Sequence, residues 1–157
     1  MEQEKKFMQE AIKLALINVD IANGGPFGAV VVKDGEIIGK GQNEVTAKND
    51  PTAHAEIVAI RDACQNLGTF DLSDCELYAS CEPCPMCLGS IYWANIHKLY
   101  YAATKDDAAK ADFDDAHIYQ EFALSKEKRS IPSAQLLREE AVKVFDKWMS
   151  SDKKIHY

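Results

Sequence analysis

The stretch ELYASCEPCPMCLGSIYWA, residues 76–94, predicts a strand that leads directly into a helix. Residues 76–80 form a short run typical of a strand. Pro83 and Pro85 lie where the next helix should begin, because proline is tolerated in the first turn of a helix. That helix would continue to about Ala94.

Other segments extend this pattern on both sides. The motif Asn49-Asp50-Pro51-Thr52 is typical of a helix start, and Gly68 would end the helix that follows. Asp34-Gly35 is typical of a type I′ turn between two strands. The further elements that we predict are helices over 7–21 and 53–67 and strands over 29–32, 36–41 and 98–102. This order favours a mixed sheet with helices packed on it.

The pattern is looser after Thr104. Five aspartates fall between Asp106 and Asp115, interrupted by Phe113, and such a run is also typical of a solvated loop. A helical period returns with apolar residues over 137–148.

Length and charge limit the function classes. A chain of 157 residues corresponds to one domain at about 150 residues per domain. The net charge of −7 makes nucleic acid an unlikely main partner. No apolar run approaches the ~20 residues that span a membrane, and we expect no signal peptide. Five cysteines without a secretion signal favour a reducing compartment, so we expect a cytoplasmic protein.

Three residues form a candidate zinc site. His54, Cys84 and Cys87 are good ligands for a tetrahedral zinc ion, and three protein ligands leave one position open for water. Cys84 and Cys87 are three residues apart, so they share one helix face. The helix dipole favours their thiolate forms, and zinc lowers the pKa of a bound water toward about 7.

Glu56 is a candidate proton carrier beside this zinc. It follows His54 by two residues, and a regular helix would point the two side chains apart. We therefore expect His54 at the very start of the helix or just before it. Glu56 would then flank the metal without binding it and could move a proton from water to a substrate nitrogen.

The remaining cysteines allow other interpretations. Cys81-x-x-Cys84-x-x-Cys87 is part of an iron–sulfur pattern, but that pattern needs a fourth cysteine where Ile91 stands. We expect Cys81 to be a small buried side chain near the site. Cys64 and Cys75 are expected in the core. A purely structural zinc site is the alternative for the metal residues.

The combination H-x-E…P-C-x-x-C is the signature of zinc nucleobase deaminases. The chain resembles the cytidine-deaminase-like superfamily and, within it, the bacterial guanine deaminase family. The segments that carry this narrower resemblance span nearly the whole chain. They are GGPFGA (24–29), NDPTAHAE (49–56), SCEPCPMC (80–87), YWA (92–94), FDD (113–115) and a C-terminal tyrosine.

The resemblance implies roles for particular residues. One zinc ion per subunit would be bound by His54, Cys84 and Cys87, and Glu56 would be the proton shuttle. Asp115, with Asp114 as the alternate, would be a second acid that helps ammonia leave. The residues implied in substrate binding are Phe27, Asn43, Ala55, Trp93 and Tyr157. Without the resemblance, Trp93 could be a core residue, Phe27 an ordinary strand-start aromatic and Asn43 a turn residue.

We therefore expect an α/β fold, a three-layer α/β/α sandwich around a mixed sheet of about five strands. Residues 1–157 would form a single deaminase domain whose segment 133–157 crosses to a partner in a homodimer, where Tyr157 closes the partner's site. The expected function is hydrolytic deamination of guanine, a small purine base, to xanthine and ammonia. The alternatives are a deaminase of cytosine or of adenosine in tRNA, and a non-catalytic zinc-binding module.

Overall fold

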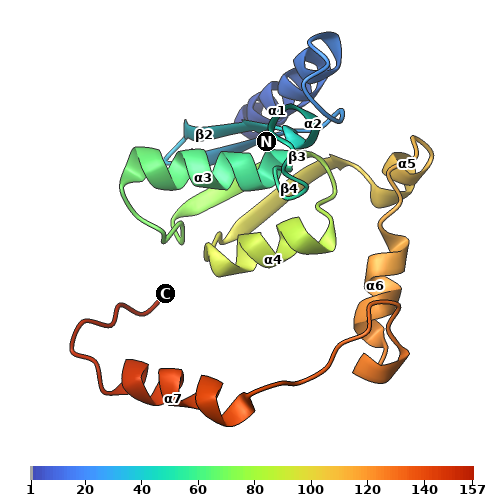
Figure 1. The fold of residues 1–157 in the computed structure, drawn as a ribbon. Coiled ribbons are helices and arrows are strands. Elements are labelled where there is room, and N and C mark those ends of the chain that lie inside the picture. The colour runs from blue at the N-terminus through green and yellow to red at the C-terminus, as the bar shows by residue number, and fades with distance from the viewer. Residues whose placement is uncertain (1) are drawn as a thin grey trace. The chain divides into compact units, whose positions relative to one another are not determined.

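The structure, a computed structural model, describes residues 2–157 (Figure 1). It divides into a first unit that ends at Asp115 and a second unit, Ala116–Tyr157. The first unit contains α1 (Glu2–Asp20), β1 (Gly28–Lys33), β2 (Glu36–Gln42), α2 (Val45–Lys48), α3 (Ala55–Leu67), β3 (Cys75–Cys81), α4 (Pro85–Trp93), β4 (Lys98–Ala103) and α5 (Lys105–Ala109).

The sheet of the first unit is mixed, in the order β2-β1-β3-β4. β1 pairs antiparallel with both β2 and β3, whereas β3 and β4 are parallel. The described residues form four strands, not the expected five or so. The reason lies just after β4, where the Thr104 hydroxyl accepts a hydrogen bond from the Asp107 N–H and the Asp107 carboxylate accepts one from the Thr104 N–H. This capping box begins the helix α5, and no strand follows it in the described residues.

The β1–β2 hairpin confirms the predicted type I′ turn. Asp34 and Gly35 both have positive φ, 51° and 80°, as this turn requires. Lys33 and Glu36 pair directly across it.

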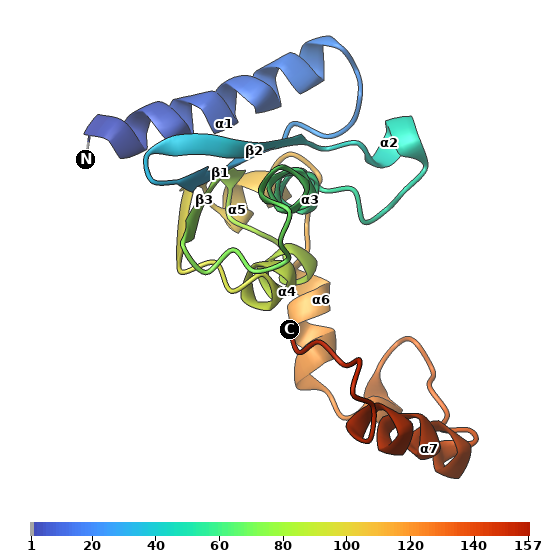
Figure 2. The same cartoon turned by 90° about the vertical axis from the view of Figure 1, so that its left-hand side faces the viewer.

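Helices cover both faces of the sheet, which gives three layers (Figures 1 and 2). Side chains alternate along β1, so Val30 packs with Ala11 of α1, whereas Val31 packs with Ala59 of α3. α4 contributes Ile91 to the core on the α3 side, and Ala94, the residue after α4, belongs to the same core. The three-layer α/β/α prediction is confirmed.

The helix α3 lies very close to β2. A Cβ atom added at Gly41 would collide with the carbonyl oxygen of Ala55 and lie 2.5 Å from the Ala59 nitrogen. Glycine at this position therefore lets the first turn of α3 rest directly against the strand.

The buried face of α1 differs from its apolar pattern. The buried residues are Ala11, Ala15 and Asn18, which follow one another at helical spacing. Ile12 and Val19 also fit the predicted helix, but they are 45% and 54% exposed. The helix turns small side chains and one amide toward the sheet.

The second unit contains α6 (Ala116–Ala123), a short 3₁₀ helix (Lys126–Lys128) and α7 (Arg138–Met149). α7 agrees with the helical period of 137–148. None of residues 116–157 is buried. Among helices of residues 2–157, none is long and apolar enough to cross a membrane.

Candidate metal centre

A tight turn brings His54 to the start of α3. The Asp50 carboxylate accepts hydrogen bonds from the Thr52 N–H and hydroxyl, and these bonds lower the pKa of Asp50. The His54 N–H then donates to the Thr52 carbonyl at 2.8 Å. His54 itself is the N-cap of α3, with extended backbone, as predicted.

The two cysteines lie at the start of α4. Cys84 is the N-cap, Pro85 is the first helical residue, and Cys87 lies in the first turn. His54 Nδ1 lies 3.5 Å from the Sγ of Cys84 and 3.5 Å from the Sγ of Cys87. The structure thus brings together all three predicted ligands, with their ligand atoms within 4.8 Å of one another.

These distances fit a zinc ion. Zn–N bonds of about 2.0–2.1 Å and Zn–S bonds of about 2.3 Å at a tetrahedral angle place N and S about 3.6 Å apart. The observed 3.5 Å separations match that value. One imidazole and two thiols are also the ligand types that zinc prefers.

Hydrogen bonds within the group favour a thiolate. Cys84 accepts hydrogen bonds from the Cys87 side chain and from His54, which lowers the pKa of Cys84 to about 4. The hydrogen bond to Cys84, together with burial, raises the pKa of Cys87. The same contact with Cys84 raises the pKa of His54.

Glu56 lies beside this group in the first turn of α3. Its side chain is buried and interacts with Cys87, and burial is the main reason why its pKa is raised. Glu56 contributes no atom to the three-ligand group found among the described residues. The expected arrangement, a flanking carboxyl group that does not bind the metal, is therefore consistent with the geometry.

Asn43 and Phe27 are connected to each other and to the loop before His54. The Asn43 N–H donates to the Phe27 carbonyl at 3.2 Å. The next residue, Glu44, donates its N–H to the carbonyl of Ala53 at 2.9 Å. Asn43 is buried, and Phe27 packs against the core on the α3 side.

The Phe113-Asp114-Asp115 segment lies near the same residues. The rings of Phe27 and Phe113 make an edge-to-face contact, with centroids 5.0 Å apart. Asp115 is half-buried, and burial, followed by the negative charge of Cys84, raises its pKa. Asp114 is exposed. Of the two candidates for a second acid, Asp115 is therefore the more buried one.

The other predicted substrate residues have different surroundings. Ala55, the first residue of α3, is buried. Trp93, the last residue of α4, is 70% exposed, so it is not a core residue. Tyr157 belongs to the second unit and is 78% exposed.

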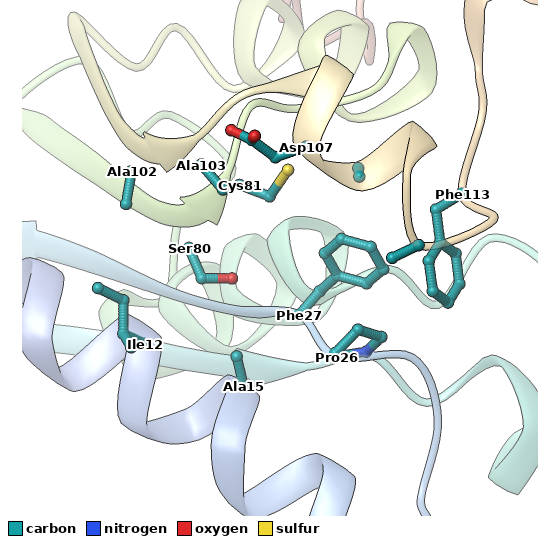
Figure 3. Close-up of a pocket in the computed structure, with 12 residues that line it drawn as sticks. Ile12, Ala15, Pro26, Phe27, Ser80, Cys81, Ala102, Ala103, Asp107 and Phe113 are labelled. Carbon is teal, nitrogen blue, oxygen red and sulfur yellow. The ribbon is translucent and has the colours of Figure 1, made fainter.

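A pocket of about 390 Å³ opens on the α1 side of the sheet (Figure 3). Ile12 and Ala15 line it from α1, and the rings of Phe27 and Phe113 lie at one end. None of the three zinc-ligand candidates lines it. The pocket is therefore separate from the three-ligand group, and the Phe27–Phe113 pair lines it.

The remaining cysteines are structural, as expected. Cys81 is buried, its Sγ donates to the Thr104 carbonyl, and burial raises its pKa to about 11. Cys75 is buried in the core, and Cys64 packs against that core. Within residues 2–157, Cys81 is not part of the metal group.

One residue near the site was missed by the sequence analysis. Asn18 of α1 is fully buried and donates hydrogen bonds to the carbonyls of Gly25 and Asn43. The signal was an amide that continues the helical spacing of Ala11 and Ala15. The apolar pattern of α1 predicts a helix from Ile12 and Val19, and it does not indicate that Asn18 is buried.

Comparison with known proteins finds similar sequences, a similar solved structure and a matching family. The chain is 53% identical over 151 residues to a guanine deaminase of Bacillus subtilis (strain 168). The aligned region covers 96% of this chain and 97% of that protein. It is 49% identical over 78 residues to a tRNA-specific adenosine deaminase of Aquifex aeolicus (strain VF5), covering 50% of this chain and 52% of that protein. The X-ray structure of guanine deaminase from Bacillus subtilis superimposes with a TM-score of 0.95 at 52% identity, covering 98% of both chains.

Residues 1–103 match the family described as the cytidine and deoxycytidylate deaminase zinc-binding region. This match includes both ligand-bearing helix starts, and the described residues place the ligands at zinc-binding distances. The chain therefore belongs to the zinc-binding cytidine and deoxycytidylate deaminase family.

Proposed function

We propose that this protein is a zinc-dependent guanine deaminase, which hydrolyses guanine to xanthine and ammonia. The observation that carries the proposal is the extent of the likeness. Identity to the Bacillus subtilis guanine deaminase covers 96% of this chain and so includes both units, whereas the identity to the Aquifex aeolicus protein covers 50%. Zinc bound by His54, Cys84 and Cys87 would supply an activated water for the hydrolysis.

Glu56 is the proton carrier of this proposal. Burial raises the pKa of Glu56, so this carboxyl group keeps a proton more readily than an exposed glutamate, as a group that must both accept and donate a proton requires. It would take a proton from the water and deliver protons to the ring and to the leaving amino nitrogen. Its place beside the ligands, without joining them, supports that role.

Asp115 is the second acid, with Asp114 as the alternate. Burial and the nearby charge of Cys84 raise the pKa of Asp115, so its protonated form is favoured more than in an exposed aspartate. A proton held there would help the amino group leave as ammonia. The exposed position of Asp114 makes it the weaker candidate.

Four residues of the first unit would hold the purine. Asn43 would donate a hydrogen bond to it, Phe27 would contact its ring, Ala55 would line the base of the site, and Trp93 would form a wall. Two backbone hydrogen bonds support a common site. Asn43 donates to Phe27, and Glu44 donates to Ala53, which precedes His54.

We also propose a homodimer in which segment 133–157 crosses to the partner and Tyr157 closes the partner's site. The support is the apolar surface of the second unit. The side chains of Leu136, Leu137, Val144, Phe145, Met149 and Tyr157 are each more than 60% exposed in the single chain. Association would remove this surface from water. A zinc site of free thiols further favours the cytoplasm as its compartment.

The decisive experiment is ammonia release by the purified, zinc-loaded protein with guanine, adenine, cytosine and cytidine in parallel. We expect release from guanine alone, with xanthine as the product. Release from cytosine or cytidine would move the assignment to a pyrimidine deaminase and overturn the roles of Asn43, Asp115 and Tyr157.

A tRNA adenosine deaminase is the second candidate, favoured by the likeness to the Aquifex aeolicus protein. The net charge of −7 is unfavourable for binding an RNA backbone. Inosine formation in a tRNA substrate, with no release from guanine, would establish it.

A further inference from the structure

Asn18 is a buried amide whose hydrogen bonds join two separate loops. It has no exposed surface, and its Nδ2 donates to the Gly25 carbonyl at 2.7 Å and to the Asn43 carbonyl at 2.9 Å. Its Oδ1 is also buried and accepts no hydrogen bond from residues 2–157. A buried amide whose oxygen has no hydrogen-bond donor is unfavourable for stability. An apolar side chain of similar shape at this position would leave no acceptor unpaired. This arrangement points to a task for its two N–H groups.

The partner of Asn18, Asn43, is fixed on several sides. Its N–H donates to the Phe27 carbonyl, and its Oδ1 accepts from the N–H groups of Gly25 and Val45, both at 3.2 Å. A backbone N–H can only donate, so the Oδ1 must face these two groups. The Nδ2 of Asn43 therefore faces the other way, and no residue of 2–157 accepts a hydrogen bond from it. Both of its N–H groups are left for a ligand.

The backbone of Gly24 packs directly against Asn43. A Cβ atom added at Gly24 would collide with the Asn43 carbonyl oxygen and lie 2.6 Å from its Oδ1. Asn43 is thus confined by the Gly24 backbone and held by the Asn18 amide. The same amide holds Gly25, two residues before Phe27.

We propose that Asn18 is a positioning residue for purine binding. Its two hydrogen bonds fix Asn43 with its amide N–H groups directed toward an acceptor atom of the base, and fix the loop that carries the Phe27 ring. The inference rests on the proposed purine contacts of Asn43 and Phe27. Loss of the Asn18 amide releases the Asn43 carbonyl and the Gly25 carbonyl together. The Asn43 side chain is then held only by the Gly25 and Val45 N–H groups, so its orientation is less firmly fixed.

The test compares Asn18→Leu with Asn66→Leu. Leucine keeps the approximate shape of asparagine and removes both the N–H donors and the unpaired Oδ1. Asn66 is the control for loss of an amide-to-carbonyl hydrogen bond, at an exposed position away from Asn43, because its Nδ2 donates from α3 to the Ile38 carbonyl of β2 at 2.9 Å. For Asn18→Leu we expect the KM for guanine to rise on the order of tenfold, with a smaller change in kcat and unchanged zinc content. Asn66→Leu should leave both constants near those of the wild type.

Amide hydrogen exchange gives a readout that needs no turnover. The Gly25 and Val45 N–H groups donate to the Asn43 side chain, so their exchange reports its position. We expect both to exchange faster in Asn18→Leu and not in Asn66→Leu. If Asn18→Leu does not fold, Asn18→Ser, which retains one hydroxyl donor, should show the same changes at smaller size.

The outcomes separate the two proposals. Unchanged exchange at Gly25 and Val45 in the Asn18 variants, with a KM within twofold of the control, would overturn the positioning role. If the wild type releases no ammonia from guanine, the proposed function fails. The exchange of Gly25 and Val45 would still decide whether Asn18 positions Asn43.

Discussion

The two units of the chain differ in how they are stabilised. The first unit buries apolar residues on both faces of its sheet and contains the metal group. The second unit, residues 116–157, has no buried residue, and α7 exposes Val144 and Phe145, each at 67%. Burial of apolar surface is the main favourable contribution to folding. The comparison indicates that the first unit is stabilised by its own core, whereas the second has no buried core of its own.

The largest expected effect concerns the chemistry of the first unit. Replacing Glu56 by Gln keeps the shape but removes the proton carrier, so kcat for guanine should fall on the order of 10³-fold. Zinc content, measured by atomic absorption, should equal that of the wild type. Retained activity would contradict the role of Glu56 as the proton carrier. A wild type that binds zinc but shows no turnover would favour a non-catalytic zinc-binding module.

The next effect tests whether the second unit contributes to the site. Removing residues 155–157 should lower kcat/KM for guanine by roughly 10- to 100-fold, because Tyr157 would no longer close the partner's site. The thermal midpoint of unfolding should change little, since these residues are not buried. An unaltered kcat/KM would refute the crossover of the tail.

A smaller effect is expected on association. Phe145→Glu places a charge on the apolar face of α7, so the dissociation constant of the dimer should rise at least about tenfold. Lys147→Gln, on the same helix, gives the same change in charge and serves as the control. Sedimentation velocity at micromolar concentration measures both, and a wild-type monomer under these conditions would contradict the homodimer.

The smallest expected effect is on the free energy of unfolding, when the N-cap residue of a helix is replaced in each unit. Thr104→Ala removes the capping box of α5 and should lower the free energy of unfolding by about 1 kcal/mol. Ser125, the N-cap of the 3₁₀ helix in the second unit, makes no capping hydrogen bond, so Ser125→Ala should change it much less. Urea titration of both variants checks this difference, and equal losses would show that the contrast between the units does not extend to their caps.

Local sequence signals predicted most of the first unit. Asp34-Gly35 indicated the hairpin, and the two prolines on either side of Cys84 indicated the start of α4, because these features act over a few neighbouring residues. The same reason explains why the three zinc ligands were found: each lies at a helix start that the adjacent sequence specifies.

Features that depend on distant contacts were not predictable in this way. α2 and α5 are four and five residues long, too short to show a helical period. The burial of Asn18, beside the exposure of Ile12, depends on which face of α1 meets the sheet. Packing against strands elsewhere in the chain determines this face, so the sequence pattern of α1 alone does not predict it.

The metal group also has a consequence for the stability of the chain. His54 and Cys84 are separated by 30 residues, and the segment between them contains α3 and β3. An ion bound by both would act as a cross-link that closes this loop, as a disulfide does, and would reduce the entropy of the unfolded chain. Chelation should therefore loosen the segment between the two helix starts as well as stop turnover, so the same three residues link metal supply to the lifetime of the folded protein.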